Sequence, residues 1–336
     1  MSLDLEAVAR WMAGQGIDIQ VPLSAEKFSG GQSNPTYLLK SAHKAWVLRR
    51  KPAGALLKSA HAVEREFRVQ CALAGSDVPV APMIALCEDA GVIGSAFYLM
   101  DHVSGRCFDD PRLLDVLMGE RASYINEMGR VLAAIHKIDL TATGLSDYGP
   151  RGNYYRRQID RWSQQYRASE TGVILAMDGL MAALDVACPQ DDGRATLVHG
   201  DYRIDNLLFA PDAPRIAAVL DWELSTIGHP FADLAAVIMQ WQMPPGDQGR
   251  GLRGVGRAAL GLPSDEVVVA AYCDRMGLAR IDNFGFYVGF CFFRMAAILQ
   301  GVKKRALDGT ASDPERGLRL GALVPDYAAA GLEALG

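Results

Sequence analysis

Two short polar motifs, each placed directly after an apolar run, constrain this chain more than any other feature. The motif HGDYRIDN (residues 199–206) begins at the last residue of the run 195–199, which is otherwise mostly apolar. The motif DWE (residues 221–223) directly follows the apolar run 216–220. Runs of this length and composition are typical of strands. We therefore expect the carboxylate and amide side chains of both motifs to lie at strand ends.

The spacing of these polar residues matches the chemistry of phosphoryl transfer. In loops of the form H-x-D-x-x-x-x-N, the Asp aligns the attacking hydroxyl, the Asn holds a metal ion, and a second Asp joins the metal to the phosphates. Asp201, Asn206 and Asp221 fill these positions. Glu223 lies two residues beyond Asp221, so a continuing strand would place both carboxylates on one face, as possible metal ligands.

A simpler interpretation is a surface loop in which Asp and Asn side chains cap turns. A lone Asp and Asn at this spacing would indicate nothing more. The ordered set of His199, Asp201, Asn206 and Asp221, each following a predicted strand, favours the catalytic interpretation.

The segments LVHGDYRIDNLLF and VLDWELSTIGHPFADLA resemble the aminoglycoside phosphotransferase-like family, and more closely the kinase-like domains attached to some acyl-CoA dehydrogenases. The resemblance also includes FSGGQSNPTYLL, HAVEREF and NYYRRQIDRW. It implies an α+β, two-lobed protein-kinase-like fold. Residues 1–104 would form a small N-terminal lobe with an antiparallel sheet and the interlobe linker, and residues 105–336 a larger, mostly helical C-terminal lobe. It also implies ATP- or GTP-dependent phosphorylation of a small molecule, with Mg²⁺.

The N-terminal part carries the signals of the small sheet. Residues 26–28, 36–39 and 45–48 have the lengths and side chains of antiparallel strands. The turn between the first two strands contains Gly30, Gly31 and Ser33, which the resemblance places in a phosphate-covering loop. A plain hairpin turn also favours Gly and Asn, so both interpretations remain open.

A helical pattern over residues 59–73 follows the third strand. The resemblance assigns Glu66 to the carboxylate that holds a phosphate-binding cation, and Arg49 occupies the position where a Lys is usual. Arg can pair with both carboxylate and phosphate, although its reach and geometry differ from those of Lys. Lys51 is the other candidate for the phosphate-binding cation, and the simpler interpretation of Arg50 and Lys51 is a solvated cluster of positive charge. The linker from Asp101 to Val103 would contact the nucleotide base through its backbone.

Four further residues of interest lie in the predicted helices of the C-terminal part. Asp233 lies near a helix start, and we expect it to support the catalytic loop by bonding its backbone. His136 ends a predicted helix and should be structural, facing the last carbonyls or a neighbouring loop. Arg157 and Arg161 lie four residues apart, so their common face either meets an anionic substrate or is simply solvated.

Composition excludes some classes of partner. Half of the 336 residues are apolar, which suffices for a large core, and the net charge of -5 offers no basic face for nucleic acid. The apolar runs are too short or too interrupted by charge to predict a membrane span. Six scattered cysteines without a C-x-x-C pair, and a start without a leader pattern, favour a cytoplasmic protein.

The acceptor is suggested by charge and by the resemblance. From residue 231 onward, 11 acidic residues balance 11 basic ones, which argues against polycationic aminoglycosides. A hydroxyacyl compound or its CoA thioester, linked functionally to an acyl-CoA dehydrogenase, is expected instead, with Arg157, Arg161 and the cluster 303–305 as phosphate contacts. A catalytically weak, pseudokinase-like nucleotide-binding protein is the alternative, since Arg49 replaces the usual Lys.

Overall fold

The computed structural model describes residues 3–28, 34–52, 62–246, 250–311 and 313–336. The chain forms two compact units. The first comprises Met1–Cys107, Thr141–Leu145 and Asn206–Ser225, and the second comprises Phe108–Leu140, Ser146–Asp205 and Thr226–Gly336. The first unit thus takes in two segments from later in the chain. The division into lobes at residue 104 remains a prediction.

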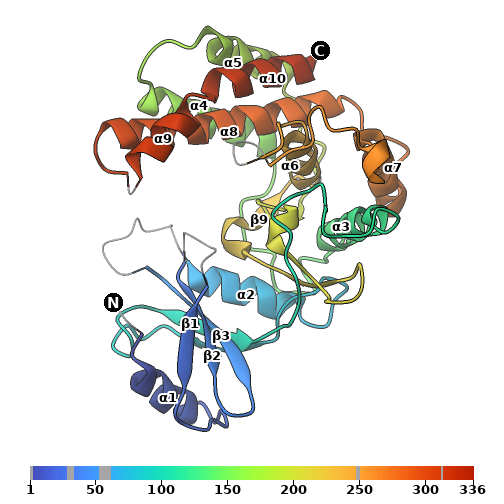
Figure 1. The fold of residues 1–336 in the computed structure, drawn as a ribbon. Helices are drawn as coiled ribbons and strands as arrows, with labels where there is room; N and C mark the ends of the chain where they lie inside the picture. The colour runs from blue at the N-terminus through green and yellow to red at the C-terminus, as the bar shows by residue number, and fades with distance from the viewer. Residues whose placement is uncertain (1–2, 29–33, 53–61, 247–249, 312) are drawn as a thin grey trace. The chain divides into compact units, whose positions relative to one another are not determined.

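The first unit is built on a five-stranded antiparallel sheet with the order β1-β2-β3-β5-β4 (Figure 1). The strands are β1 (Ser24–Lys27), β2 (Thr36–Lys40), β3 (Ala45–Arg50), β4 (Met83–Cys87) and β5 (Phe97–Asp101). The predicted small antiparallel sheet is therefore confirmed.

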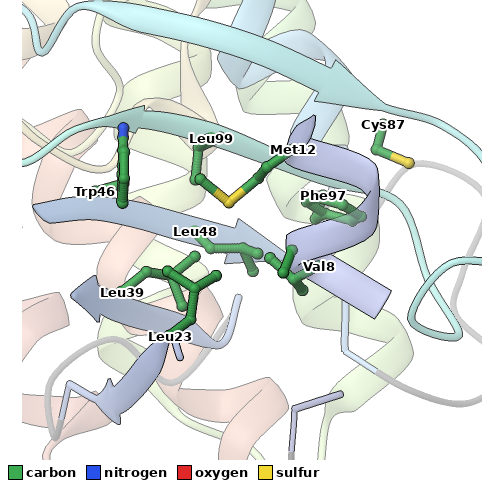
Figure 2. Packing of buried hydrophobic residues seen from close by; sticks show 10 residues of the cluster. Val8, Met12, Leu23, Leu39, Trp46, Leu48, Cys87, Phe97 and Leu99 are labelled. Carbon is green, nitrogen blue, oxygen red and sulfur yellow. The ribbon is translucent and has the colours of Figure 1, made fainter. Parts of the chain in front are cut away.

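Two helices cover opposite faces of this sheet, because side chains alternate between the faces along each strand. Phe97 and Leu99 of β5 pack with Val8 and Met12 of α1 (Leu5–Gly14), as Figure 2 shows. The intervening Tyr98 packs on the other face, with α2 (Val63–Leu73). Each fully buried apolar side chain contributes roughly 1.5–3 kcal/mol. Burial beneath the two helices therefore stabilises the register in which Phe97 and Leu99 face α1 and Tyr98 faces α2.

A hairpin from the second half of the chain also belongs to the first unit. It consists of β7 (Leu207–Phe209) and β8 (Ile216–Val219), which pair antiparallel. Its backbone is tied to the N-terminal segment by a bridge between Arg106 and Phe209 and by a hydrogen bond from Val219 N to the Pro79 carbonyl, at 2.9 Å. A short 3-10 turn, η1 (Ile204–Asn206), precedes the hairpin, and another, η2 (Trp222–Leu224), follows it.

The second unit is mostly helical. Its long helix α8 (Phe284–Leu307) packs against five others (Figure 1): α4 (Tyr154–Ser169), α5 (Leu175–Ala187), α6 (Phe231–Trp241), α9 (Pro314–Gly321) and α10 (Val324–Leu335). The remaining helices are α3 (Arg121–His136), η3 (Ala258–Leu260) and α7 (Asp265–Met276). By length and composition alone α8 is apolar enough to span a membrane, but 67% of its most apolar window is buried by the fold, so this is weak evidence for a span.

A two-stranded sheet in the second unit presents the first polar motif. Strands β6 (Thr196–Val198) and β9 (Thr226–Gly228) pair antiparallel, and the motif at residue 199 begins directly after β6. The sheet is tightly packed: a Cβ atom at Gly228 would lie 2.8 Å from side-chain atoms of Tyr154 and Val198. This packing requires Gly at the end of β9, just before α6 begins.

Candidate functional site

Strand register places Arg49 next to Tyr98 on the sheet face that α2 covers. Arg49 of β3 is the antiparallel partner of Tyr98 on β5 and of Thr36 on β2. Because neighbouring residues of β3 point to opposite faces, Leu48 enters the core beneath α1 while Arg49 faces α2. The Arg49 side chain is only 10% exposed, so its charge requires buried partners.

Glu66 of α2 supplies the first of these partners. Its side chain is 1% exposed, and its Oε2 atom lies 2.9 Å from Arg49 Nε. The Tyr98 hydroxyl also donates to Oε2, at 3.2 Å, and the Asn34 side-chain amide donates to Oε1, at 2.7 Å. The predicted pairing of Arg49 with Glu66 is therefore confirmed as a contact, and Asn34 and Tyr98 are additional members of the site that the sequence did not reveal.

Burial and charge act in opposite directions on this pair. Burial raises the pKa of Glu66 from its usual 4.5 to about 7, even though Arg49 lowers it. Asp221 and Glu223 add to the rise by repulsion. For Arg49, burial lowers the pKa, but the surrounding acids, with Glu66 foremost, hold it above its usual value. Arg49 therefore stays charged, whereas Glu66 titrates near neutral pH.

Asp221 and Glu223 reach the same guanidinium from the end of the β7–β8 hairpin. Arg49 Nη2 contacts Asp221 Oδ1 and lies 3.6 Å from Glu223 Oε2. The expected continuation of the strand is wrong: β8 ends at Val219, Asp221 has a left-handed φ of 62°, and Glu223 lies in η2. Trp222 is buried and its Nε1 donates to the Val219 carbonyl, at 3.0 Å, which stabilises this turn. The turn, and not strand alternation, brings the two carboxylates together.

Asn206 lies at the other side of the same hairpin. Leu220 N donates to the Asn206 carbonyl, at 2.8 Å, so the residue before Asp221 is hydrogen-bonded to Asn206. Asn206, Asp221 and Glu223 are all oxygen donors, as Mg²⁺ requires, and Mg²⁺ is commonly bound by one or two carboxylates together with substrate phosphates. The donor set therefore fits Mg²⁺. Among the described residues, no group of three or more His, Cys, Asp or Glu side chains is arranged to hold a metal by itself.

Asp201 lies in the second unit, in a loop whose backbone is held by Asp233. The N–H groups of His199 and Gly200 donate to the Asp233 carboxylate, at 2.6 and 2.8 Å. Arg294 of α8 donates to the Gly200 carbonyl, at 3.1 Å. The prediction that Asp233 supports this loop through its backbone is confirmed. Fixing both peptide groups before Asp201 limits where the Asp201 carboxylate can point.

Buried partners keep Asp233 ionised. Burial alone would raise its pKa, but interactions with His136 and His199 lower it below the usual value. His136 Nε2 lies 3.4 Å from Asp233, and His136 Nδ1 lies 2.6 Å from the Tyr272 hydroxyl. The expectation that His136 faces helix carbonyls or a loop is wrong, because its ring joins α6 and α7 instead. A charged Asp233 accepts stronger hydrogen bonds from the loop.

A series of ion pairs links Asp201 to Arg203, Asp205 and Arg250 within the second unit. Arg203 Nε lies 3.1 Å from Asp201 Oδ1, and Arg203 Nη2 lies 3.2 Å from Asp205 Oδ2. Arg250 Nη1 lies 2.8 Å from the same Asp205 oxygen. The sequence interpretation did not use Arg203 or Asp205, although their alternation with Asp201 at every second residue is a visible signal. Arg250 is distant in sequence and gave no signal.

The proposed phosphate contacts of the second unit are placed less favourably. Arg157 donates to the carbonyls of Pro150 and Arg151, at 3.1 and 3.2 Å, so its guanidinium holds a loop. Arg161 is exposed and lies over the ring of Trp162, 5.5 Å from its centroid. In the cluster at residues 303–305, Lys304 pairs with Asp308 at 2.6 Å.

The remaining predicted contacts belong to the first unit. Gly30, Gly31 and Ser33 lie outside the described residues. Asp101 ends β5, where its N–H donates to the Pro82 carbonyl, at 2.9 Å, and its carboxylate lies 3.0 Å from Lys44 Nζ. The Asp101 N–H is thus already engaged. Val103 follows, half-buried, and its contact with a nucleotide base stays a prediction.

Comparison with known proteins places this chain in a family. The model of the phosphotransferase enzyme family matches residues 24–267. Acyl-CoA dehydrogenase family member 10 of Mus musculus is 45% identical over 314 residues, which are 93% of this chain but only 29% of that protein. The chain thus spans less than a third of this relative.

Solved structures agree on the fold. A candidate aminoglycoside phosphotransferase from Ralstonia eutropha is 47% identical, with a TM-score of 0.90, over 99% of this chain and 98% of that one. A thermostable mutant of aminoglycoside phosphotransferase APH(4)-Ia, in a ternary complex with AMP-PNP and hygromycin B, has a TM-score of 0.64 at 16% identity, over 98% of each chain. The predicted α+β kinase-like fold is confirmed.

Proposed function

Since this chain belongs to the phosphotransferase enzyme family, we propose that it is a kinase that transfers a phosphoryl group from a nucleotide to a hydroxyl of a small molecule. The observation that supports this most is the convergence of Asp221 and Glu223 on the guanidinium of Arg49, which Glu66 holds from behind. Carboxylates for a metal and a buried cation for phosphates are the parts that phosphoryl transfer requires.

Each residue then has a role that follows from its chemistry. Asn206, Asp221 and Glu223 would hold Mg²⁺, which when bound neutralises charge on the phosphates. Arg49 would steady the phosphates while Glu66 keeps its guanidinium in place. Positioning and charge neutralisation account for most of the catalysis in this type of reaction.

Asp201 would align the acceptor hydroxyl and accept its proton. Its backbone is positioned through Asp233, and its carboxylate is oriented by Arg203, 3.1 Å away. A fixed carboxylate is an effective proton acceptor only when the hydroxyl lies within hydrogen-bonding reach. The small-molecule acceptor should therefore bind next to Asp201.

The nucleotide would be ATP or GTP. Its phosphates are assigned to Gly30, Gly31 and Ser33 as well as Arg49, and its base to the backbone from Asp101 to Val103. The complex of the APH(4)-Ia mutant with AMP-PNP supports nucleotide use by this fold. Either purine nucleotide remains part of the proposal.

For the acceptor we propose a hydroxyacyl compound or its CoA thioester. Support comes from the relative named as an acyl-CoA dehydrogenase family member, which is longer than this chain, and from the balanced charge after residue 231. A functional link to an acyl-CoA dehydrogenase belongs to the same proposal. The contacts of Arg157 with Pro150 and Arg151 leave Arg161 as the better-placed cation of that pair. A cytoplasmic location is also proposed, since all six cysteines are free thiols.

The test is a nucleotide-consumption screen with Mg²⁺ against hydroxyacyl-CoA esters, free hydroxy acids, simple alcohols and aminoglycosides. We expect turnover with a hydroxyacyl acceptor and none with aminoglycosides. Turnover restricted to aminoglycosides would refute the proposed acceptor. Nucleotide binding without turnover on any member would favour the pseudokinase-like alternative, which among the described residues only the Arg at position 49 favours.

A further inference from the structure

We propose that Asn34 is a positioning residue that keeps Arg49 directed toward the nucleotide by occupying one oxygen of Glu66. The inference rests on the function proposed above and assigns the orientation of its phosphate-binding cation to a residue outside the expected pair.

Asn34 is fixed and fully buried. Its side chain is 0% exposed and donates to Glu66 Oε1 at 2.7 Å. Its carbonyl accepts a hydrogen bond from Thr36 Oγ1 at 3.1 Å, and the carbonyl of the adjacent Pro35 accepts one from Arg50 N at 3.0 Å. Asn34 is therefore anchored to β2 and β3, the latter being the strand that carries Arg49.

The two oxygens of Glu66 have different partners. Oε2 lies 2.9 Å from Arg49 Nε and accepts from the Tyr98 hydroxyl, whereas Oε1 is held by Asn34. Among the described residues, Asn34 is the donor to Oε1. Arg49 therefore meets Glu66 through one nitrogen on one oxygen, and its Nη2 extends to Asp221 and Glu223.

This arrangement is not the one that an arginine and a carboxylate would choose alone. A guanidinium and a carboxylate prefer two parallel contacts that use both carboxylate oxygens. If Oε1 lost its donor, it would be a buried acceptor without a partner, and a second nitrogen of Arg49 could satisfy it. The guanidinium would then turn toward Glu66 and withdraw from Asp221 and Glu223.

Glu66 Oε1 needs a separate donor because residue 49 is an arginine. A lysine has one nitrogen and cannot form the two-contact pair, so it would not need this restraint. An arginine at the same position has a longer reach and a second donor. However, both of its donors can bind the two oxygens of Glu66, and the contacts with Asp221 and Glu223 are then lost; this is the capture that a lysine cannot undergo. Asn34 prevents that capture.

The test is a double-mutant cycle between Asn34→Ala and Arg49→Lys, with calorimetric titration of Mg²⁺ and AMP-PNP as the readout. With Arg49 present, Asn34→Ala should weaken nucleotide binding roughly tenfold or more, the scale of one charge-assisted hydrogen bond. In the Arg49→Lys background the same change should weaken binding by less than about twofold, because a lysine cannot be captured.

Thermal denaturation of the nucleotide-free variants separates positioning from a purely structural role. Removal of the donor to Oε1 should lower the melting temperature less with Arg49 present than in the Arg49→Lys background, because a second nitrogen of Arg49 can satisfy Oε1 and a lysine leaves it without that partner. Ser95→Ala is the matched control: Ser95 is also buried and bonds Arg50 Nε at 3.0 Å, but it does not touch Glu66. It should leave nucleotide affinity nearly unchanged. Should Asn34→Ala fail to fold, Asn34→Leu, which is similar in size and has no donor, carries the same cycle with the same expected direction.

An equal loss of nucleotide affinity with Arg49 present and in the Arg49→Lys background would overturn the inference, as would an unchanged affinity in the Asn34 variants. Failure of the unaltered protein to bind Mg²⁺ and AMP-PNP would instead refute the proposed function, and the role of Asn34 with it.

Discussion

Replacing Arg49 with Lys tests whether the Arg49 guanidinium must contact Glu66 on one side and Asp221 and Glu223 on the other. Arg49 contacts Glu66 through Nε and Asp221 through Nη2, and Glu223 lies 3.6 Å from Nη2. A single ammonium group can satisfy Glu66 or the pair of Asp221 and Glu223, but it cannot span both. Arg49→Lys should therefore lose at least one hydrogen bond between charged groups.

Such a bond contributes about 1.5–3 kcal/mol, which corresponds to roughly a 10- to 150-fold change in affinity. We expect the dissociation constant for Mg²⁺ and AMP-PNP to rise by that factor in Arg49→Lys, and further in Arg49→Ala. Calorimetric titration measures both. Lys51→Ala is the control, because Lys51 pairs with Glu64 at a partly exposed position and surface pairs contribute little.

An affinity of Arg49→Lys equal to that of the unaltered protein would refute this reasoning, since the bridging geometry would then have no energetic value. A larger effect from Lys51→Ala than from Arg49→Ala would show that Lys51, directly after β3, and not Arg49 is the phosphate-binding cation.

Three further predictions concern the carboxylates. Asp221→Ala should abolish metal-dependent nucleotide binding, because the metal loses its main carboxylate; unchanged turnover in that variant would remove the metal assignment. Asp201→Asn should keep nucleotide affinity while turnover falls by about 10²–10⁴-fold, the usual contribution of positioned proton transfer; equal losses in affinity and rate would make Asp201 a metal ligand or a structural residue. Between pH 4.5 and about 7 the folded protein holds a proton on Glu66 that the unfolded chain has lost. The protonated Glu66 therefore adds to the free energy of unfolding at low pH, and this stabilisation is lost as the pH rises to about 7. In thermal denaturation without metal, the unaltered protein should lose stability relative to Glu66→Gln across that window, and parallel profiles would contradict the assignment.

Local patterns predicted the parts of this protein that depend on local structure. The strand around Arg49 and the helix around Glu66 each have a clear period, and the pairing of the two residues followed from their places in the resemblance. Asp233 was assigned to the catalytic loop because it lies at a helix start, and its hydrogen bonds to His199 and Gly200 confirm this.

Features that depend on contacts distant in sequence were not visible. Asn34 looked like a turn residue, since nothing local shows that its side chain reaches Glu66, 32 residues away. Glu223 was proposed as a partner of Asp221 on the assumption that the strand continues. That assumption was wrong, because Asp221 adopts a left-handed φ although it is not a Gly, and no local pattern indicated this turn. Arg157 has the charge of a substrate contact, but the carbonyls that it binds come from a loop whose path the sequence did not reveal.

The most direct measurement of the central claim follows the γ-phosphoryl group itself. The protein is incubated with Mg²⁺, a nucleotide labelled in that group and a hydroxyacyl-CoA acceptor, and the products are separated by mass spectrometry. We predict that the label appears on the acceptor hydroxyl with the unaltered protein and not with Asp201→Asn. Label that remains on the nucleotide, or that is released only as inorganic phosphate, would contradict phosphoryl transfer to this acceptor.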